Sequence, residues 1–141
     1  MPRRVLVIDD SLEIAESFAR MLEAMGHCAT FVINPLDALD AAEGIQAEVI
    51  FIDIDMPKID GWELARLLRG RFGYDAVRLV AVTALGRPED RARSRRAGFD
   101  AHLVKPLPAD TLRAALEAVF DSARAAQPCA AQARASQLPM Q

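Results

Sequence analysis

The stretch of sequence that decides the fold is Val5-Leu6-Val7-Ile8-Asp9-Asp10-Ser11. A short run that is apolar at every position is typical of a strand buried on both faces inside a parallel sheet. The pattern recurs at residues 49–52, which are followed by Asp53, and at residues 79–82, which are followed by Thr83. Each of these buried strands is therefore followed by a polar residue at its carboxyl end.

Two further apolar runs, Cys28–Ile33 and Ala101–Val104, complete a set of five strands. The segments between them have helical character, as in the spacing of Ile14, Phe18 and Leu22. The expected later helices run from Asn34-Pro35 to Gly44, from Asp60 to breaks at Gly70 and Gly73, from Pro88 to Gly98, and from about Pro108 onward. Five alternations of strand and helix predict an α/β domain, with helices on both faces of a parallel sheet and right-handed crossovers.

Length and composition are those of an ordinary globular protein. The 141 residues suit one hydrophobic core, and a net charge of −3 lacks the basic excess of nucleic-acid-binding proteins. No apolar run approaches the ~20 residues of a membrane span, and the N-terminus does not resemble a signal peptide, so we expect a cytoplasmic protein. Cys28 and Cys129 are expected to be free thiols rather than a disulfide or a metal site.

The composition changes near residue 123. Beyond it the sequence is rich in Ala and Gln, contains Pro128 and Pro139, and has no apolar period. We therefore expect one domain at residues 1–122 and a disordered tail or interdomain linker at residues 123–141.

Three carboxylates follow two of the buried strands, Asp9 and Asp10 after the first and Asp53 after the third. In open α/β sheets, ligands bind beyond the carboxyl ends of the strands, where the strand order reverses. With the strand order 2-1-3-4-5, this point lies between the first and third strands, so the three carboxylates are expected to converge. Because like charges oppose one another's ionisation, the cluster favours a divalent cation, and oxygen-only ligands favour Mg²⁺.

The fourth and fifth strands end in Thr83 and Lys105, which bring a hydroxyl and an ammonium to the same edge. A nucleophilic carboxylate, a metal ion, a cation and a hydroxyl donor are together suited to a phosphoryl group. The residue types therefore predict phosphoryl chemistry at the carboxyl edge of the sheet.

With these residues in place, the sequence resembles the receiver domains of response regulators, the chemotaxis-regulator-like proteins of bacterial two-component signalling. The resemblance covers about residues 3–122 and is specific because its landmarks follow the correct strands in the correct order. The matching segments are residues 5–11, 53–61, 80–84 and 98–106. The resemblance implies the flavodoxin-like (βα)5 fold, a doubly wound five-stranded parallel sheet of order 2-1-3-4-5.

The resemblance implies that Asp53 accepts the phosphoryl group. It also implies a Mg²⁺ site in which Asp10 and Asp53 touch the metal directly and Asp9 acts mostly through water. The backbone carbonyl of Asp55 would complete this metal site.

The resemblance also assigns the switch. Thr83 and Lys105 would bind the phosphoryl oxygens, and Lys105-Pro106 resembles the family's cis peptide. His102 occupies the place usually held by Tyr or Phe, whose ring turns inward when the threonine moves. Because His is polar and titrates near neutrality, the change indicates either a weakened or pH-sensitive switch, or a tolerated substitution at a half-exposed strand position.

The implied protein is a regulator rather than an enzyme, limited to Mg²⁺-dependent self-phosphorylation and autodephosphorylation. Its phosphoryl donor would be a histidine kinase or a histidine phosphotransfer protein. Phosphorylation would shift the face of the fourth helix, fifth strand and fifth helix toward binding a downstream protein. We expect a monomer or weak dimer, with no nucleic-acid partner.

Several positions allow more than one interpretation. Asp55 and Leu85 would flank the attacking water and tune the phosphoryl lifetime, with Leu85 as a shield. Trp62 is expected to be partly buried against the sheet edge, and His27 to lie at the surface without a partner. The arginines of the fourth helix form either a partner-docking face or a solvated face with local ion pairs. They are Arg87, Arg91, Arg93, Arg95 and Arg96.

Two other functions remain open. Asp53-Ile54-Asp55 also resembles the first motif of haloacid-dehalogenase-type phosphatases, but that family places the motif on its first strand, and Asp9 and Asp10 would be unexplained. A phosphorylation-independent, receiver-like interaction module is supported only by His102. The chain is either a free-standing regulator or the receiver segment of a hybrid kinase.

Overall fold

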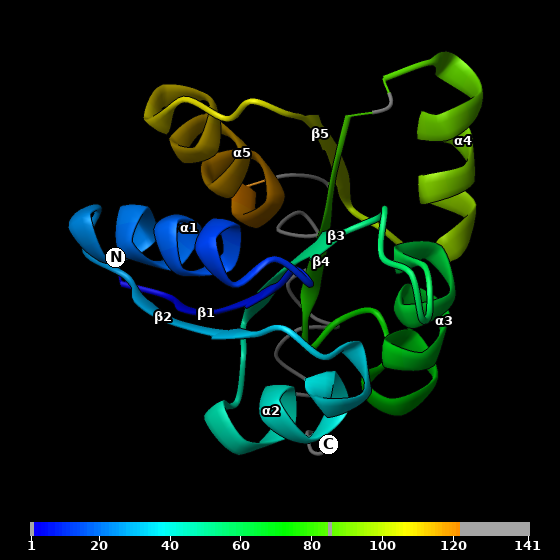
Figure 1. Ribbon diagram of the computed structural model, residues 1–141, viewed down its shortest axis with the longest axis horizontal. Coiled ribbons are helices and arrows are strands. Elements are labelled where there is room, and N and C mark those ends of the chain that lie inside the picture. Colours follow the sequence, from blue (N-terminus) through cyan, green and yellow to red (C-terminus); the bar gives the residue numbers. More distant parts are fainter. Residues whose placement is uncertain (1, 85, 122–141) are drawn as a thin grey trace.

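The computed structural model describes residues 2–84 and 86–121, which fold into three layers around a central sheet (Figure 1). Five parallel strands make up the sheet, in the order β2-β1-β3-β4-β5. The strands are β1 (Arg4–Ile8), β2 (Cys28–Val32), β3 (Val49–Asp53), β4 (Arg78–Thr83) and β5 (Ala101–Val104). This confirms the doubly wound parallel sheet of order 2-1-3-4-5.

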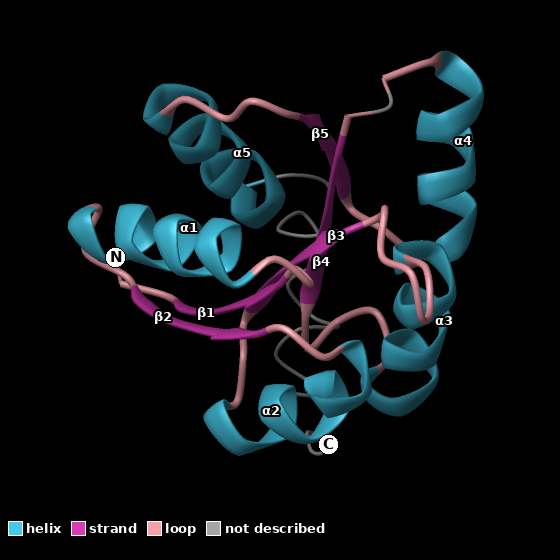
Figure 2. Cartoon of the chain, in the orientation of Figure 1, coloured by secondary structure: helices cyan, strands magenta, loops and turns pink. Residues whose placement is uncertain are grey.

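Helices follow each strand and cover both faces of the sheet (Figure 2). They are α1 (Leu12–Ala24), the short 3₁₀ turn η1 (Pro35–Asp37), α2 (Ala38–Ile45), α3 (Gly61–Phe72), α4 (Pro88–Ala97) and α5 (Ala109–Asp121). Helices α1 and α5 pack on one face, and α2, α3 and α4 pack on the other. Within the described ranges, no helix combines the length and the apolar character that crossing a membrane demands. The tail or linker predicted at residues 123–141 lies outside the described residues.

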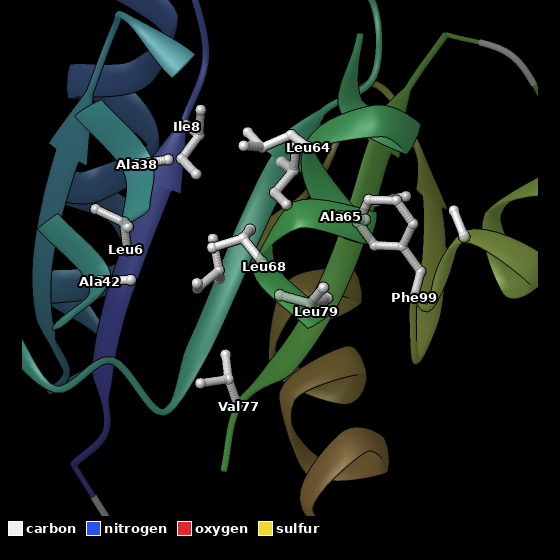
Figure 3. Packing of buried hydrophobic residues seen from close by; sticks show 14 of the residues in the cluster. Leu6, Ile8, Ala38, Ala42, Leu64, Ala65, Leu68, Val77, Leu79 and Phe99 are labelled. Atoms are coloured by element: carbon white, nitrogen blue, oxygen red, sulfur yellow. The ribbon is translucent and has the colours of Figure 1, made fainter. Parts of the chain in front are cut away.

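The three central strands, β1, β3 and β4, contribute side chains to two separate cores because successive residues of a strand point to opposite faces. Figure 3 shows part of one core, in which the small side chains Ala38 and Ala42 of α2 lie beside Ile8 and Leu6 of β1. The alternate residues of β1 pack with α1 and α5 in the second core. Burial on both faces explains why the strands read as continuous apolar runs.

Two helices continue past glycines that were expected to end them. Helix α2 ends at Ile45 rather than Gly44, and the left-handed residue is Gln46, with φ 54°. Helix α3 continues through Gly70 and ends before Gly73, which has φ +78°. The predicted ends at Gly44 and Gly70 were wrong because a glycine costs a helix interior only about 1 kcal/mol, which packing overrides.

The start of α3 is pressed against the end of β3. Asp60 caps the helix as predicted, since its Oδ1 accepts the Glu63 backbone N–H at 2.8 Å. The next residue, Gly61, donates its N–H to the Ile54 carbonyl at 3.1 Å. A Cβ at Gly61 would lie 2.8 Å from the Ile54 Cα and 2.9 Å from the Asp53 carbonyl oxygen. The Ile54 Cδ1 atom would lie equally close, at 2.8 Å, but the two backbone atoms cannot move aside as the end of a side chain can.

We expect Gly61→Ala to lower the free energy of unfolding by about 1–3 kcal/mol, because the added methyl overpacks the junction. Gly70→Ala is the matched control, since nothing lies within 4 Å of its new Cβ. It should raise stability by up to about 1 kcal/mol through helix propensity. Urea unfolding of both variants measures the difference, and equal stability for the two would contradict the close approach.

Candidate functional site

The carboxyl ends of β1 and β3 bring Asp9, Asp10 and Asp53 together. The parallel register aligns Ile8 with Ile52, so the acids that follow these two residues emerge side by side. One carboxylate oxygen from each acid lies within 4.8 Å of the others. Asp9 and Asp53 are 4% and 6% exposed, whereas Asp10 faces solvent. The predicted convergence is confirmed, and three carboxylates at this spacing fit a hard divalent cation.

Lys105 extends into the same cluster from the end of β5. Its Nζ lies 3.6 Å from an oxygen of Asp9 and 3.6 Å from an oxygen of Asp53. The Lys105 backbone N–H donates to the Thr83 carbonyl at 2.8 Å, which ties it to the end of β4. The Lys105–Pro106 peptide bond is cis, as expected. The ammonium therefore offsets part of the negative charge of both buried carboxylates.

The environment of Asp53 disfavours its charged form. Burial raises the pKa of Asp53 from 3.8 to about 6, and the neighbouring charge of Asp9 adds to the rise. The backbone N–H of Asp55, 3.1 Å from Asp53 Oδ1, and the ammonium of Lys105 lower this pKa and offset part of the effect. A divalent cation at the cluster would favour ionised Asp53, because it supplies the opposite charge that burial makes valuable.

Thr83 lies near this cluster, but its hydroxyl already has a partner. The side chain is fully buried, and its Oγ1 donates to Asp55 Oδ2 at 3.0 Å. A phosphoryl oxygen at Asp53 would therefore compete with Asp55 for the Thr83 hydroxyl. The sequence assigned Asp55 a carbonyl in the metal site and a place beside the attacking water, but it did not predict this bond, because no periodicity orients a side chain in an irregular loop.

His102 is half-buried on β5 and is held by a residue that the sequence did not single out. Its Nδ1 lies 2.8 Å from Ser94 Oγ on α4, and the same hydroxyl accepts the Trp62 indole N–H at 3.0 Å. Trp62 is buried, as expected, but its polar atom bonds to α4 rather than to the sheet edge. A lone serine in an arginine-rich helix carries no sequence signal for such a contact.

The arginines of α4 divide between the two interpretations left open by the sequence. Arg87 forms local ion pairs with Asp90 at 2.9 Å and Glu89 at 3.7 Å. The other arginines of the helix form no ion pair with a carboxylate of the described residues. They are Arg91, Arg93, Arg95 and Arg96. Arg87 thus fits the interpretation of local ion pairing, and the partner-docking interpretation stays a prediction for the other four.

Two minor predictions have different outcomes. His27 was expected to lack a partner, which was wrong: its Nδ1 accepts the Arg3 backbone N–H at 3.0 Å, and burial lowers the pKa of His27. Its partner comes from a distant segment that local sequence does not place beside it. The predicted shield, Leu85, lies outside the described residues, so its role stays a prediction.

Comparison with known proteins agrees with this geometry. A family model described as the response regulator receiver domain matches residues 5–117. The chain belongs to this family. It is thus a receiver domain of the kind found in the response regulators of two-component systems, and the resemblance drawn from the strand ends is confirmed.

Several relatives and solved structures resemble this receiver domain. The polar-differentiation response regulator DivK of Brucella anthropi is 30% identical over 107 residues, covering 76% of this chain and 87% of that protein. The response regulator MprA of Mycobacterium tuberculosis is 31% identical over 120 residues, which are 85% of this chain. The chain spans about half the length of the MprA proteins, 51% in this case. The Vibrio cholerae chemotaxis protein CheY4 superposes with a TM-score of 0.77 at 26% identity, covering 83% of this chain and 98% of that one.

We expect Asp53→Asn to stabilise the metal-free receiver at pH 7 by about 1–3 kcal/mol. When folding raises the pKa of a carboxyl, the protein loses stability as the pH rises from the unfolded pKa, near 3.8, to the folded pKa, near 6. The gain should therefore be full above pH 6 and absent below about pH 4. Urea unfolding with a chelator, from pH 4 to 7.5, measures it; a gain independent of pH would contradict the raised pKa.

Proposed function

We propose that this receiver domain is a phosphorylation-dependent switch of a two-component phosphorelay, with Asp53 as the phosphoacceptor. The observation that supports it most strongly is the contact of Lys105 with both Asp53 and Asp9, at 3.6 Å each. An ammonium and an acidic cluster around one buried carboxylate suit the arrival of a phosphoryl group. One Asp53 oxygen would form the P–O bond while the P–N bond of a phospho-histidine donor breaks.

The proposed metal ion is Mg²⁺, held by Asp9, Asp10 and Asp53 together with the backbone carbonyl of Asp55. The carboxylate oxygens within 4.8 Å of one another support this assignment, since oxygen ligands that leave room for waters favour Mg²⁺. When bound, the ion would offset negative charge on the phosphoryl oxygens. It would also keep Asp53 ionised, which a nucleophilic carboxylate requires.

Two side chains would respond to the phosphoryl group. Lys105, which contacts the carboxylate of Asp53 before transfer, would pair with a phosphoryl oxygen afterwards. Thr83 would exchange its bond to Asp55 for one to the phosphoryl group, because the modified Asp53 carries a charge of roughly −1.5 to −2. These movements would shift the face of α4, β5 and α5 toward conformers that bind a downstream protein.

A groove beside the acceptor supports docking of the phosphoryl donor. It has a volume of about 820 Å³ and lies between α1 and the segment that follows β5. Lys105 lines it together with Ile14 and Phe18 of α1 and Leu107. Because Lys105 also contacts Asp53, a histidine kinase or histidine phosphotransfer protein seated here would present its phospho-histidine next to the acceptor.

The remainder of the proposal follows from the family. Residues 1–122 would be the receiver domain and residues 123–141 a tail or linker, in a cytoplasmic regulator that is a monomer or weak dimer. It would bind no nucleic acid itself. The phosphatase alternative loses its support, because the family match includes the two strand–helix units that precede Asp53. A phosphorylation-independent interaction module remains the alternative that the first experiment must separate.

We expect the protein to gain the mass of one phosphoryl group when incubated with Mg²⁺ and acetyl phosphate, as measured by intact-protein mass spectrometry. Asp53→Asn should gain none, since it removes the nucleophile, and a chelator should abolish the gain in the wild type. If folded wild-type protein gains no phosphoryl mass from acetyl phosphate or from a phospho-histidine donor, the interaction module replaces the switch.

The groove predicts a variant that separates donor docking from chemistry. We expect Ile14→Glu to slow transfer from a phospho-histidine protein by roughly tenfold or more, because a charge enters an apolar contact surface. Its rate with acetyl phosphate should stay unchanged. Leu67→Glu is the matched control, since both side chains lie on helices and are 45% exposed. Equal slowing of the two variants would contradict docking at α1.

A further inference from the structure

A single buried hydroxyl joins three elements on the α4 side of the sheet. Ser94 of α4 is 1% exposed, and its Oγ accepts the indole N–H of Trp62 from α3 at 3.0 Å. The same Oγ lies 2.8 Å from Nδ1 of His102 on β5. We call these three side chains the Trp62–Ser94–His102 relay.

The donor and the acceptor of one hydrogen bond in the relay follow from residue type. An indole N–H is only a donor, so Ser94 must accept at that bond. The hydroxyl still has one proton to donate and one lone pair to accept with, and either can serve the Nδ1 of His102. Ser94 is thus the one group of the relay that bonds to both of the others, and its removal separates His102 from Trp62.

Neighbouring contacts hold the same arrangement from outside. The guanidinium of Arg93 lies 3.9 Å from the centre of the Trp62 ring. Arg91 donates to the His102 carbonyl at 3.2 Å and to the Gly86 carbonyl at 3.4 Å. Helix α4 is therefore bonded to β5 through both the ring and the backbone of His102.

The position of His102 connects the relay to the site of phosphorylation. In the register of the two strands, His102 lies opposite Ala81, and Val104 lies opposite Thr83, two residues further along. Thr83 in turn donates to Asp55 beside the acceptor. His102, whose ring Ser94 holds, therefore lies two residues before the position on β5 that pairs with Thr83, the residue that is expected to move.

We propose that Ser94 is the positioning residue of the switch: it holds the ring of His102 against α4 while Asp53 is unmodified. The relay opens when the phosphoryl group draws Thr83 away. This inference rests on the proposed function for its trigger, although the relay itself exists without phosphorylation. It also assigns a role to the histidine at this position, because a phenylalanine ring has no atom that can form a hydrogen bond with Ser94.

The first test needs no phosphoryl group. The chain contains one tryptophan, so its indole N–H gives a single side-chain signal in a ¹H–¹⁵N spectrum. We expect Ser94→Ala to shift this signal and to increase its hydrogen exchange at least severalfold, because the buried bond is lost. An unchanged signal in a folded Ser94→Ala protein would overturn the relay, whatever the phosphorylation experiments show.

The second test measures the coupling to phosphorylation. A hydrogen bond that stabilises only the resting conformer lowers the population of the responsive one, so its loss should raise the rate of phosphorylation by acetyl phosphate. From the usual net contribution of such a bond, we expect Ser94→Ala and His102→Phe each to raise that rate roughly threefold to tenfold. The double variant should match the single variants rather than their product, because both changes remove the same bond between Ser94 and His102.

The outcomes separate this inference from the proposed function. Wild-type rates in both single variants, or multiplied effects in the double variant, would overturn the positioning role of Ser94. Failure of the wild-type protein to gain phosphoryl mass would instead overturn the switch itself and the trigger that it supplies. Because His102→Phe removes the bond from the strand side, the test stands even if Ser94→Ala does not fold.

Discussion

The crowding of acidic groups at one edge of the sheet is the constraint on which the rest of the structure depends. Asp9 and Asp53 are both buried, and burial beside a like charge opposes the ionisation of Asp53. Lys105 offsets part of this negative charge, since its ammonium contacts both carboxylates. This contact requires three strands to end at the same edge in a defined register, which ordinary hydrophobic packing does not demand. The receiver thus keeps an electrostatically unfavourable site, which the proposed metal ion or phosphoryl group would change strongly.

Rigid and movable parts of the site come from different kinds of contact. The backbone near Asp53 is held by the close approach of Gly61 and by strand pairing, neither of which leaves space for adjustment. The Thr83 hydroxyl, by contrast, donates a hydrogen bond to Asp55, a residue of an exposed loop. Under the proposed function, a local change of charge would redirect this hydroxyl without disturbing the sheet that presents it.

The face formed by α4 and β5 contains His102, at the position where the resemblance to receiver domains led us to expect Tyr or Phe. A histidine stands at the ring position, and a buried serine and a tryptophan bond around it. Arginines without carboxylate partners among the described residues lie on the same helix. Under the proposed function, these groups of α4 and β5 would carry the state of the acceptor site to a partner.

Much of this protein was determined by the sequence alone. Strand runs, the Asp60 cap and the acids after the strands depend on local periodicity and on residue type, so they identify the fold, the edge and the family. Only the tertiary structure decided the bond between Thr83 and Asp55, the raised pKa of Asp53 and the helix ends beyond Gly44 and Gly70. The contact between Trp62 and Ser94 joins residues 32 positions apart. Burial and partners of this kind depend on how separate elements pack, and no local pattern records them.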